Sequence, residues 1–120
     1  MAQRLRPVGP DFADRAPVRL VFGRDMKAAP DLVYQALAED VASMPQWFSA
    51  VTRARSTDGG REVRLRGGIR FEETVLAAEK PELYTYRVDV TNIPGARAWV
   101  EEWRLTPIGT GTRVRAVFAL

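Results

Sequence analysis

From residue 52 to residue 120, hydrophobic and polar residues alternate with a period of two, which is the pattern of strands that bury one face. Turn sequences divide this region, among them DGG at 58–60, NIPG at 92–95 and GTG at 109–111. The pattern predicts strands at residues 52–57, 61–66, 69–78, 83–92, 97–106 and 112–120. Because short turns join consecutive strands, we expect an antiparallel meander.

Residues 18–51 follow a different pattern. The stretch VRLVFGRDMK at 18–27 is rich in strand-forming residues and predicts a first strand. Pro30 suits the first turn of a helix, and an apolar stripe at helical spacing follows it, made of Leu32, Val33, Ala36 and Leu37. Because Pro45 interrupts this pattern, residues 41–51 are predicted to form a second short helix set at an angle to the first.

Alternate residues of the predicted strands separate into an apolar face and a charged face, as expected of an antiparallel sheet with one buried side. The apolar set includes Val63, Leu65, Phe71, Tyr84, Tyr86, Val88, Trp99, Trp103, Leu105 and Phe118. Two acids, Glu73 and Glu101, fall in phase with this apolar set. Since burying an unpaired carboxylate is costly, each is expected to have a partner, a raised pKa or contact with water in a pocket.

The composition excludes several kinds of chemistry. The chain has no cysteine and no histidine, which rules out disulfides, thiolate catalysis, Ser-His triads and metal sites built on these residues. The acidic residues do not cluster as a calcium loop requires, so no metal and no cofactor is predicted. The net charge is +3, but most arginines lie near acids, as in Arg70-Phe71-Glu72-Glu73, so we expect no nucleic-acid partner.

Residues 1–16 contain two prolines and several charges without any periodicity, which predicts a flexible N-terminal arm. No apolar run approaches the roughly 20 residues of a membrane-spanning helix. The N-terminal sequence also lacks the apolar core of a secretory signal. These features lead us to expect a cytoplasmic protein without stable membrane insertion.

The candidate chemistry centres on Glu101, which stands between Trp99 and Trp103 on one face of a predicted strand. Glu101 and Glu73 could form an acid/base pair in a small cavity, with pKa values raised by burial. Tyr86 could hydrogen-bond Glu101. The alternative is that one or both acids pair with an inward-facing arginine or lie at a wet rim, and that the tryptophans are simply core residues.

The chain resembles the START-like, helix-grip (SRPBCC) superfamily, and particularly its polyketide cyclase/dehydrase and lipid-transport-like branch. The matching motifs are APDLVY at 29–34, MPQW at 44–47, EKPELY at 79–84, LTP at 105–107 and GTRV at 111–114. The resemblance implies an α+β domain over residues 17–120, with a curved antiparallel sheet of about seven strands and two short helices after the first. Members of the superfamily also fold this sheet around a long C-terminal helix, which is expected to be absent here because the chain ends where the last strand would end.

The resemblance implies that the concave face binds a hydrophobic small molecule, such as a lipid, an isoprenoid or an aromatic polyketide. The expected ligand-binding residues are Trp47, Phe71, Tyr84, Trp99, Trp103 and Phe118. A first alternative is a polyketide cyclase or dehydratase that uses Glu101, Glu73 and Tyr86. A second alternative is a protein-interaction module that docks a partner through the uncovered apolar face, and a homodimer could cover that face in the same way.

Overall fold

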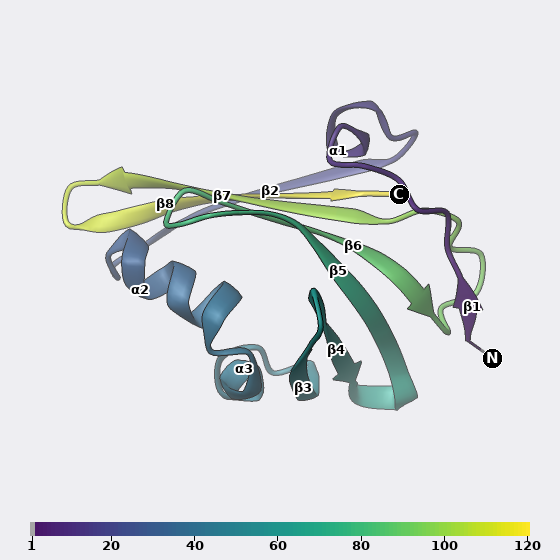
Figure 1. Ribbon diagram of the computed structural model, residues 1–120. Helices are drawn as coiled ribbons and strands as arrows, with labels where there is room; N and C mark the ends of the chain where they lie inside the picture. The colour runs from purple at the N-terminus through teal and green to yellow at the C-terminus, as the bar shows by residue number, and fades with distance from the viewer. Residues whose placement is uncertain (1) are drawn as a thin grey trace.

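The computed structural model describes residues 2–120, and one curved antiparallel sheet dominates it (Figure 1). The main path of the sheet runs in the order β2-β8-β7-β6-β5-β4-β3. The bounds are β2 Arg19–Met26, β3 Val51–Thr57, β4 Gly60–Leu65, β5 Ile69–Glu79, β6 Leu83–Thr91, β7 Val100–Ile108 and β8 Gly111–Ala119. A two-residue strand, β1 (Gln3–Arg4), pairs with β6 and completes the sheet of eight. The predicted α+β helix-grip fold is confirmed.

The helical segments are short and lie on both sides of the sheet. They are α1 (Phe12–Arg15), α2 (Pro30–Tyr34), the π-helical turn η1 (Gln35–Glu39), the 3-10 turn η2 (Val41–Ser43), α3 (Met44–Trp47) and the 3-10 turn η3 (Arg66–Gly68). Figure 1 shows α2 and α3 on one side of the sheet, with β3 and β4 curling toward them, and α1 on the other side. Within residues 2–120, no helix has both the length and the apolar character needed to cross a membrane.

Most predicted boundaries agree with the structure to within one or two residues. Helix α2 begins at Pro30, as predicted, because the extended residue Ala29 leads directly into a position that needs no backbone N–H. Strand β7 differs, since it begins at Val100 instead of residue 97. The segment before it bonds elsewhere: the Arg97 carbonyl accepts a hydrogen bond from the Arg6 backbone N–H at 2.8 Å. The last element described is β8, which ends at Ala119.

The N-terminal segment packs against the sheet, which differs from the flexible arm predicted for residues 1–16. Leu5, Phe12 and Ala13 are buried, and the Leu5 backbone N–H donates to the Asp89 carbonyl at 2.7 Å. Phe12 lies in a core cluster with residues of β7 and β8 on the side of the sheet that α1 covers. The few residues that make these contacts are too widely spaced to produce a periodic pattern. Met1 lies outside the described residues.

Two apolar clusters fill the other, concave side. One joins Tyr34 and Leu37 to Tyr84, Tyr86 and Leu105 of the sheet, together with Val114. The second lies between the η2–α3 region and strands β3 and β4, and it contains Val41, Met44, Val51, Ala54 and Val63. The candidate site lies where these two clusters meet.

Candidate functional site

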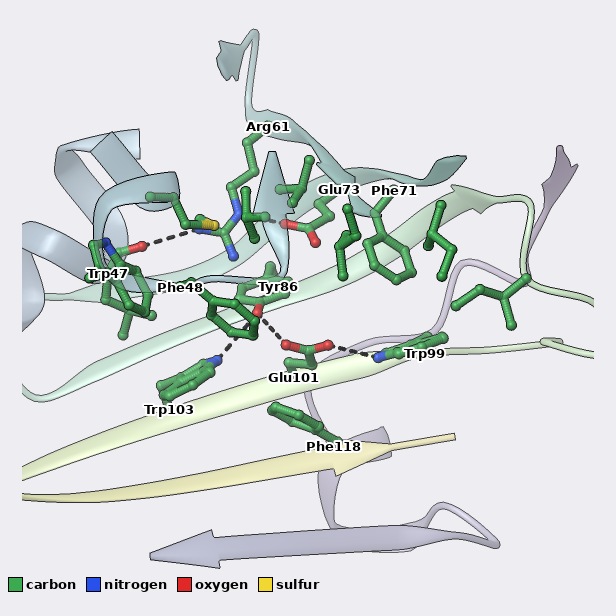
Figure 2. A pocket seen from close by; sticks show the side chains of 17 residues that line it. Trp47, Phe48, Arg61, Phe71, Glu73, Tyr86, Trp99, Glu101, Trp103 and Phe118 are labelled. Atoms are coloured by element: carbon green, nitrogen blue, oxygen red, sulfur yellow. Dashed lines mark hydrogen bonds and ion pairs between the residues drawn. The ribbon is translucent and has the colours of Figure 1, made fainter. Parts of the chain in front are cut away.

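A cavity of about 270 Å³ lies between the concave face of the sheet and the helical segments η1 to α3 (Figure 2). Its walls are mostly apolar, with aromatic rings from Trp47, Phe48, Phe71, Trp99, Trp103 and Phe118. Phe71 and Trp99 meet edge-on, with ring centroids 5.2 Å apart. The rings of Trp103 and Phe118 are tilted against each other at 5.9 Å. The cavity therefore offers aromatic surface on several sides.

A hydrogen-bonded group of polar side chains lies on the sheet side of this cavity. Tyr86 and Glu101 are direct cross-strand partners on β6 and β7, and the Tyr86 hydroxyl donates to Glu101 Oε1. Trp99 Nε1 donates to Glu101 Oε2 at 2.9 Å. Trp103 Nε1 donates to the Tyr86 hydroxyl oxygen at 3.3 Å. Glu101 therefore accepts at both carboxylate oxygens, and Figure 2 shows its carboxylate between Tyr86 and Trp99.

The protonation of Glu101 is set mainly by its enclosure within the fold. Burial, together with repulsion from the Glu73 carboxylate, raises the pKa of Glu101 to about 7, although the bonds from Tyr86 and Trp99 oppose this shift. Burial also raises the pKa of Tyr86 well above its usual value, so the phenol remains a hydrogen-bond donor near neutral pH. Near pH 7, Glu101 therefore exists in both its neutral and its ionised form.

Arg61 and Glu73 form a buried ion pair beside this group. They are cross-strand partners on β4 and β5, Arg61 Nε lies 2.5 Å from Glu73 Oε1, and their side chains are only 4% and 5% exposed. Arg61 Nη1 also donates to the Leu37 carbonyl at 3.1 Å, and the guanidinium lies 4.4 Å from the centroid of the Tyr86 ring. These contacts tie the concave face of the sheet to the helical segment that covers it.

The pKa values of Arg61 and Glu73 reflect a balance between burial and the attraction between the two charges. Burial alone would lower the pKa of Arg61, but the adjacent Glu73 carboxylate raises it above its usual value, so the guanidinium keeps its proton. Burial raises the pKa of Glu73, and the Arg61 guanidinium opposes that rise. Because its carboxylate is paired with Arg61, Glu73 has a structural role. Its negative charge also raises the pKa of Glu101.

The glycine before Arg61 allows β4 and β5 to pair so closely at this point. A Cβ on Gly60 would lie 1.8 Å from the Glu73 carbonyl oxygen, a distance that backbone atoms cannot accommodate without moving. Gly60 is also the first residue of β4 and pairs with Thr74. The sequence Gly60-Arg61 therefore places an arginine directly opposite Glu73.

The structure brings together nearly all of the residues predicted to form the site. Those that border the cavity are Trp47, Phe71, Glu73, Tyr86, Trp99, Glu101, Trp103 and Phe118. Tyr84 is the exception, because it does not border the cavity. It is 3% exposed and lies in the core, where Tyr34 packs edge-on against it with a ring-centroid distance of 6.1 Å.

Sequence reasoning missed Arg61, the buried partner of Glu73. Arg61 is in phase with Val63 and Leu65, which were placed on the apolar face, so the same alternation places it inside. It is the inward-facing arginine that one of the alternatives for Glu73 required. Phe48 also borders the cavity, although it was not among the predicted ligand-binding residues.

The site holds no arrangement suited to a metal ion. Within residues 2–120, no group of three or more acidic side chains is gathered closely enough to bind one. The functional groups that face the cavity are two carboxyls, one guanidinium, one phenol and the indole N–H groups. These groups can bind a polar end of a guest or transfer a proton.

Residues 18–120 match the family described as "Polyketide cyclase / dehydrase and lipid transport". The chain belongs to this family. The match covers β2 to β8 and all of the residues that border the cavity. The resemblance to the START-like superfamily that the sequence motifs indicate is thereby confirmed.

Similarity to individual proteins supports the fold but does not indicate an activity. The chain is 25% identical over 114 residues to an uncharacterised protein of Mycobacterium tuberculosis, covering 89% of this chain and 68% of that protein. Among solved structures, it is similar to XoxI from Bacillus cereus, with a TM-score of 0.73 and 15% identity over 85% of this chain and 74% of that one. It is also similar to ginseng major latex-like protein 151 from Panax ginseng, with a TM-score of 0.72 and 12% identity over 84% and 76% of the two chains.

Proposed function

We propose that this protein binds a hydrophobic small molecule, such as a lipid, an isoprenoid or an aromatic polyketide, in the cavity on the concave face of the sheet. The observation that carries the proposal is a cavity of about 270 Å³ whose walls are apolar and whose few polar groups converge at one place. Binding sites for small molecules have this composition, because apolar walls supply affinity and a few polar groups fix orientation. The family description, which includes lipid transport, supports the same proposal.

The positions of the aromatic residues indicate how a guest would lie. Trp47 and Phe48 are 44% and 39% exposed and lie at the outer side of the cavity. Their rings meet edge to face, with centroids 5.8 Å apart. Trp99, Trp103 and Phe118 lie deeper, beside the Tyr86–Glu101 hydrogen bond. The guest would therefore keep its apolar body between the aromatic walls and direct a polar end toward Glu101.

The proposal is tested with N-phenyl-1-naphthylamine, an uncharged dye whose fluorescence rises in apolar surroundings. The wild-type chain should bind the dye, and Ile69→Trp should weaken binding at least tenfold because Ile69 borders the cavity. The matched control is Ile108→Trp, which makes the same change on an exposed residue outside the cavity lining and should leave the affinity unchanged. Absence of dye binding to the folded wild-type chain, or equal affinities in both variants, would contradict the proposal.

A second candidate function is proton transfer of the kind that a cyclase or dehydratase requires. It is favoured by the position of Glu101 at the cavity, with its pKa raised to about 7 by burial, because a carboxyl with this pKa can both take up and release a proton near neutral pH. In this reading Glu101 transfers the proton, Tyr86 holds the carboxyl in position, and the charge of Glu73 helps to set the pKa of Glu101.

Proton transfer can be measured without knowing the natural substrate. The ketone 2-tetralone exchanges the hydrogens next to its carbonyl for deuterium in D₂O when a base removes a proton and the enolate is then deuterated. The wild-type chain should accelerate this exchange, as followed by NMR, and Glu101→Gln should abolish the acceleration while 2-tetralone still binds. If Glu101→Gln exchanges at the wild-type rate, Glu101 is not the base.

A further inference from the structure

The charges that border the cavity do not balance. The lining contains one guanidinium, from Arg61, and two carboxyl groups, from Glu73 and Glu101. Arg61 is engaged by Glu73 at 2.5 Å, whereas no Lys or Arg in residues 2–120 forms an ion pair with Glu101. When Glu73 and Glu101 are both ionised, the cavity lining therefore carries a net negative charge, although the chain as a whole has a net charge of +3. A buried charge without a counter-ion is unfavourable, and a cationic guest would supply the counter-ion.

The hydrogen bonds around Glu101 are arranged to stabilise an anion. An indole nitrogen can only donate, so Trp99 requires an acceptor at Glu101 and Trp103 requires an acceptor at the Tyr86 hydroxyl. Because the Tyr86 oxygen receives the Trp103 hydrogen, its own hydrogen is directed to Glu101. Each of these hydrogens is donated either to the Glu101 carboxylate or to the Tyr86 hydroxyl that bonds it. The groups that this network offers to a guest are therefore hydrogen-bond acceptors.

The surroundings of the carboxylate also suit a cation. Phe71 and Trp99 lie on one side of Glu101 and Trp103 lies on the other, while Phe118 is its cross-strand neighbour on β8 (Figure 2). These rings surround the carboxylate with apolar surface, which suits a charged group attached directly to an apolar body.

We propose that the guest of this cavity is an amphiphilic amine, whose ammonium group pairs with Glu101 and whose apolar body lies between the aromatic walls. The proposal rests on the proposed binding function and adds the chemical class of the guest. It differs from recognition of a fatty acid or another anion, which would place two negative charges together in the cavity.

The proposal implies a dependence of binding on pH. Burial raises the pKa of Glu101 to about 7 when no cation is bound, and an ammonium next to the carboxylate would lower it. The ionisable groups around Glu101 are Tyr86 on β6, Arg61 on β4 and Glu73 on β5, while its partner on β8 is the apolar Phe118. Affinity for an amine should therefore rise as pH increases toward 8, by up to about tenfold per pH unit below pH 7.

Three probes with the same apolar body separate the chemical classes: 1-naphthylmethylamine, 1-naphthalenemethanol and 1-naphthoic acid. Calorimetric titrations at about pH 8 should show that the amine binds the wild-type chain at least tenfold more tightly than the alcohol or the acid. Glu101→Gln should remove this preference without abolishing binding of the alcohol. Glu72→Gln is the matched control, because Glu72 is a half-exposed neighbour that does not border the cavity, and it should retain the preference. Between about pH 7 and pH 5 the amine should lose affinity while the alcohol should not.

The outcomes distinguish this proposal from the one on which it rests. If the alcohol or the acid binds the wild-type chain as tightly as the amine, or if Glu101→Gln keeps the preference, the amine proposal is overturned and the binding function stands. If neither N-phenyl-1-naphthylamine nor any of the three naphthalene probes binds, both proposals are overturned.

Discussion

The stability of the protein should fall as pH rises through neutrality, and Glu101 should be the cause. Folding encloses this carboxyl and raises its pKa from 4.5 to about 7, so the folded state holds a proton that the unfolded state has already released. Stability is therefore greatest below the unfolded pKa and is lost as pH rises through the folded pKa. The chain has no histidine, the side chain that ordinarily changes charge between pH 5 and 8.

The size of the effect follows from the shift. A difference of one pKa unit corresponds to about 1.4 kcal/mol, so the full shift of Glu101 corresponds to about 3 kcal/mol. Linkage places about 2 kcal/mol of this loss between pH 5.5 and pH 8.5, and most of the remainder below that range. Glu101→Gln removes the titrating group and keeps an oxygen that can accept from Trp99.

The assay is urea unfolding followed by tryptophan fluorescence and circular dichroism at about pH 5.5 and pH 8.5. The wild-type chain and the surface control Glu72→Gln should lose about 2 kcal/mol of unfolding free energy over this range. Glu101→Gln should lose much less and should be the more stable chain at the higher pH. If Glu101→Gln shows the same pH dependence as the wild type, the reasoning about the enclosed carboxyl is refuted.

Three further substitutions test the packing that positions the site, each measured by urea unfolding. Arg61→Met should cost about 3–5 kcal/mol because it leaves Glu73 buried without its partner, and the double variant Arg61→Met/Glu73→Leu should recover much of that loss; equal losses in both would contradict the ion pair. Gly60→Ala should cost about 2 kcal/mol or more, since its Cβ would collide with the Glu73 carbonyl oxygen, and a neutral effect would mean that β4 can move away. Phe12→Ala should cost about 3 kcal/mol because the ring is buried against β7 and β8, whereas a loss below about 0.5 kcal/mol would indicate that the N-terminal segment does not pack.

The strands and the first helix could be predicted because each produces a local signal. Alternation with a period of two identified β3 to β8, and Pro30 fixed the start of α2. The N-terminal segment gave no such signal because it contacts the sheet through only a few buried residues, such as Leu5 and Phe12. Contacts of this kind are visible only once the distant strands that they cover are in place.

The same distinction applies to the site. Alternation predicted which residues face the concave side, and most of those chosen border the cavity. It could not predict that Tyr84 would be covered, because this depends on the position of Tyr34 on α2, a tertiary contact between distant segments. Arg61, in contrast, was predictable from its phase with Val63, and only its charge argued against an inward position.

The two acids in phase with the apolar residues show how one sequence signal can have two physical solutions. A carboxyl on a buried face needs a partner, a raised pKa or access to a cavity. Glu73 has the partner, because its cross-strand neighbour is Arg61. Glu101 lies opposite Tyr86, which can donate a hydrogen bond but cannot neutralise a charge. Glu101 therefore has a raised pKa and borders the cavity. The residue opposite each acid in the adjacent strand decides between structural pairing and availability to a guest, which is why we assign the guest to Glu101.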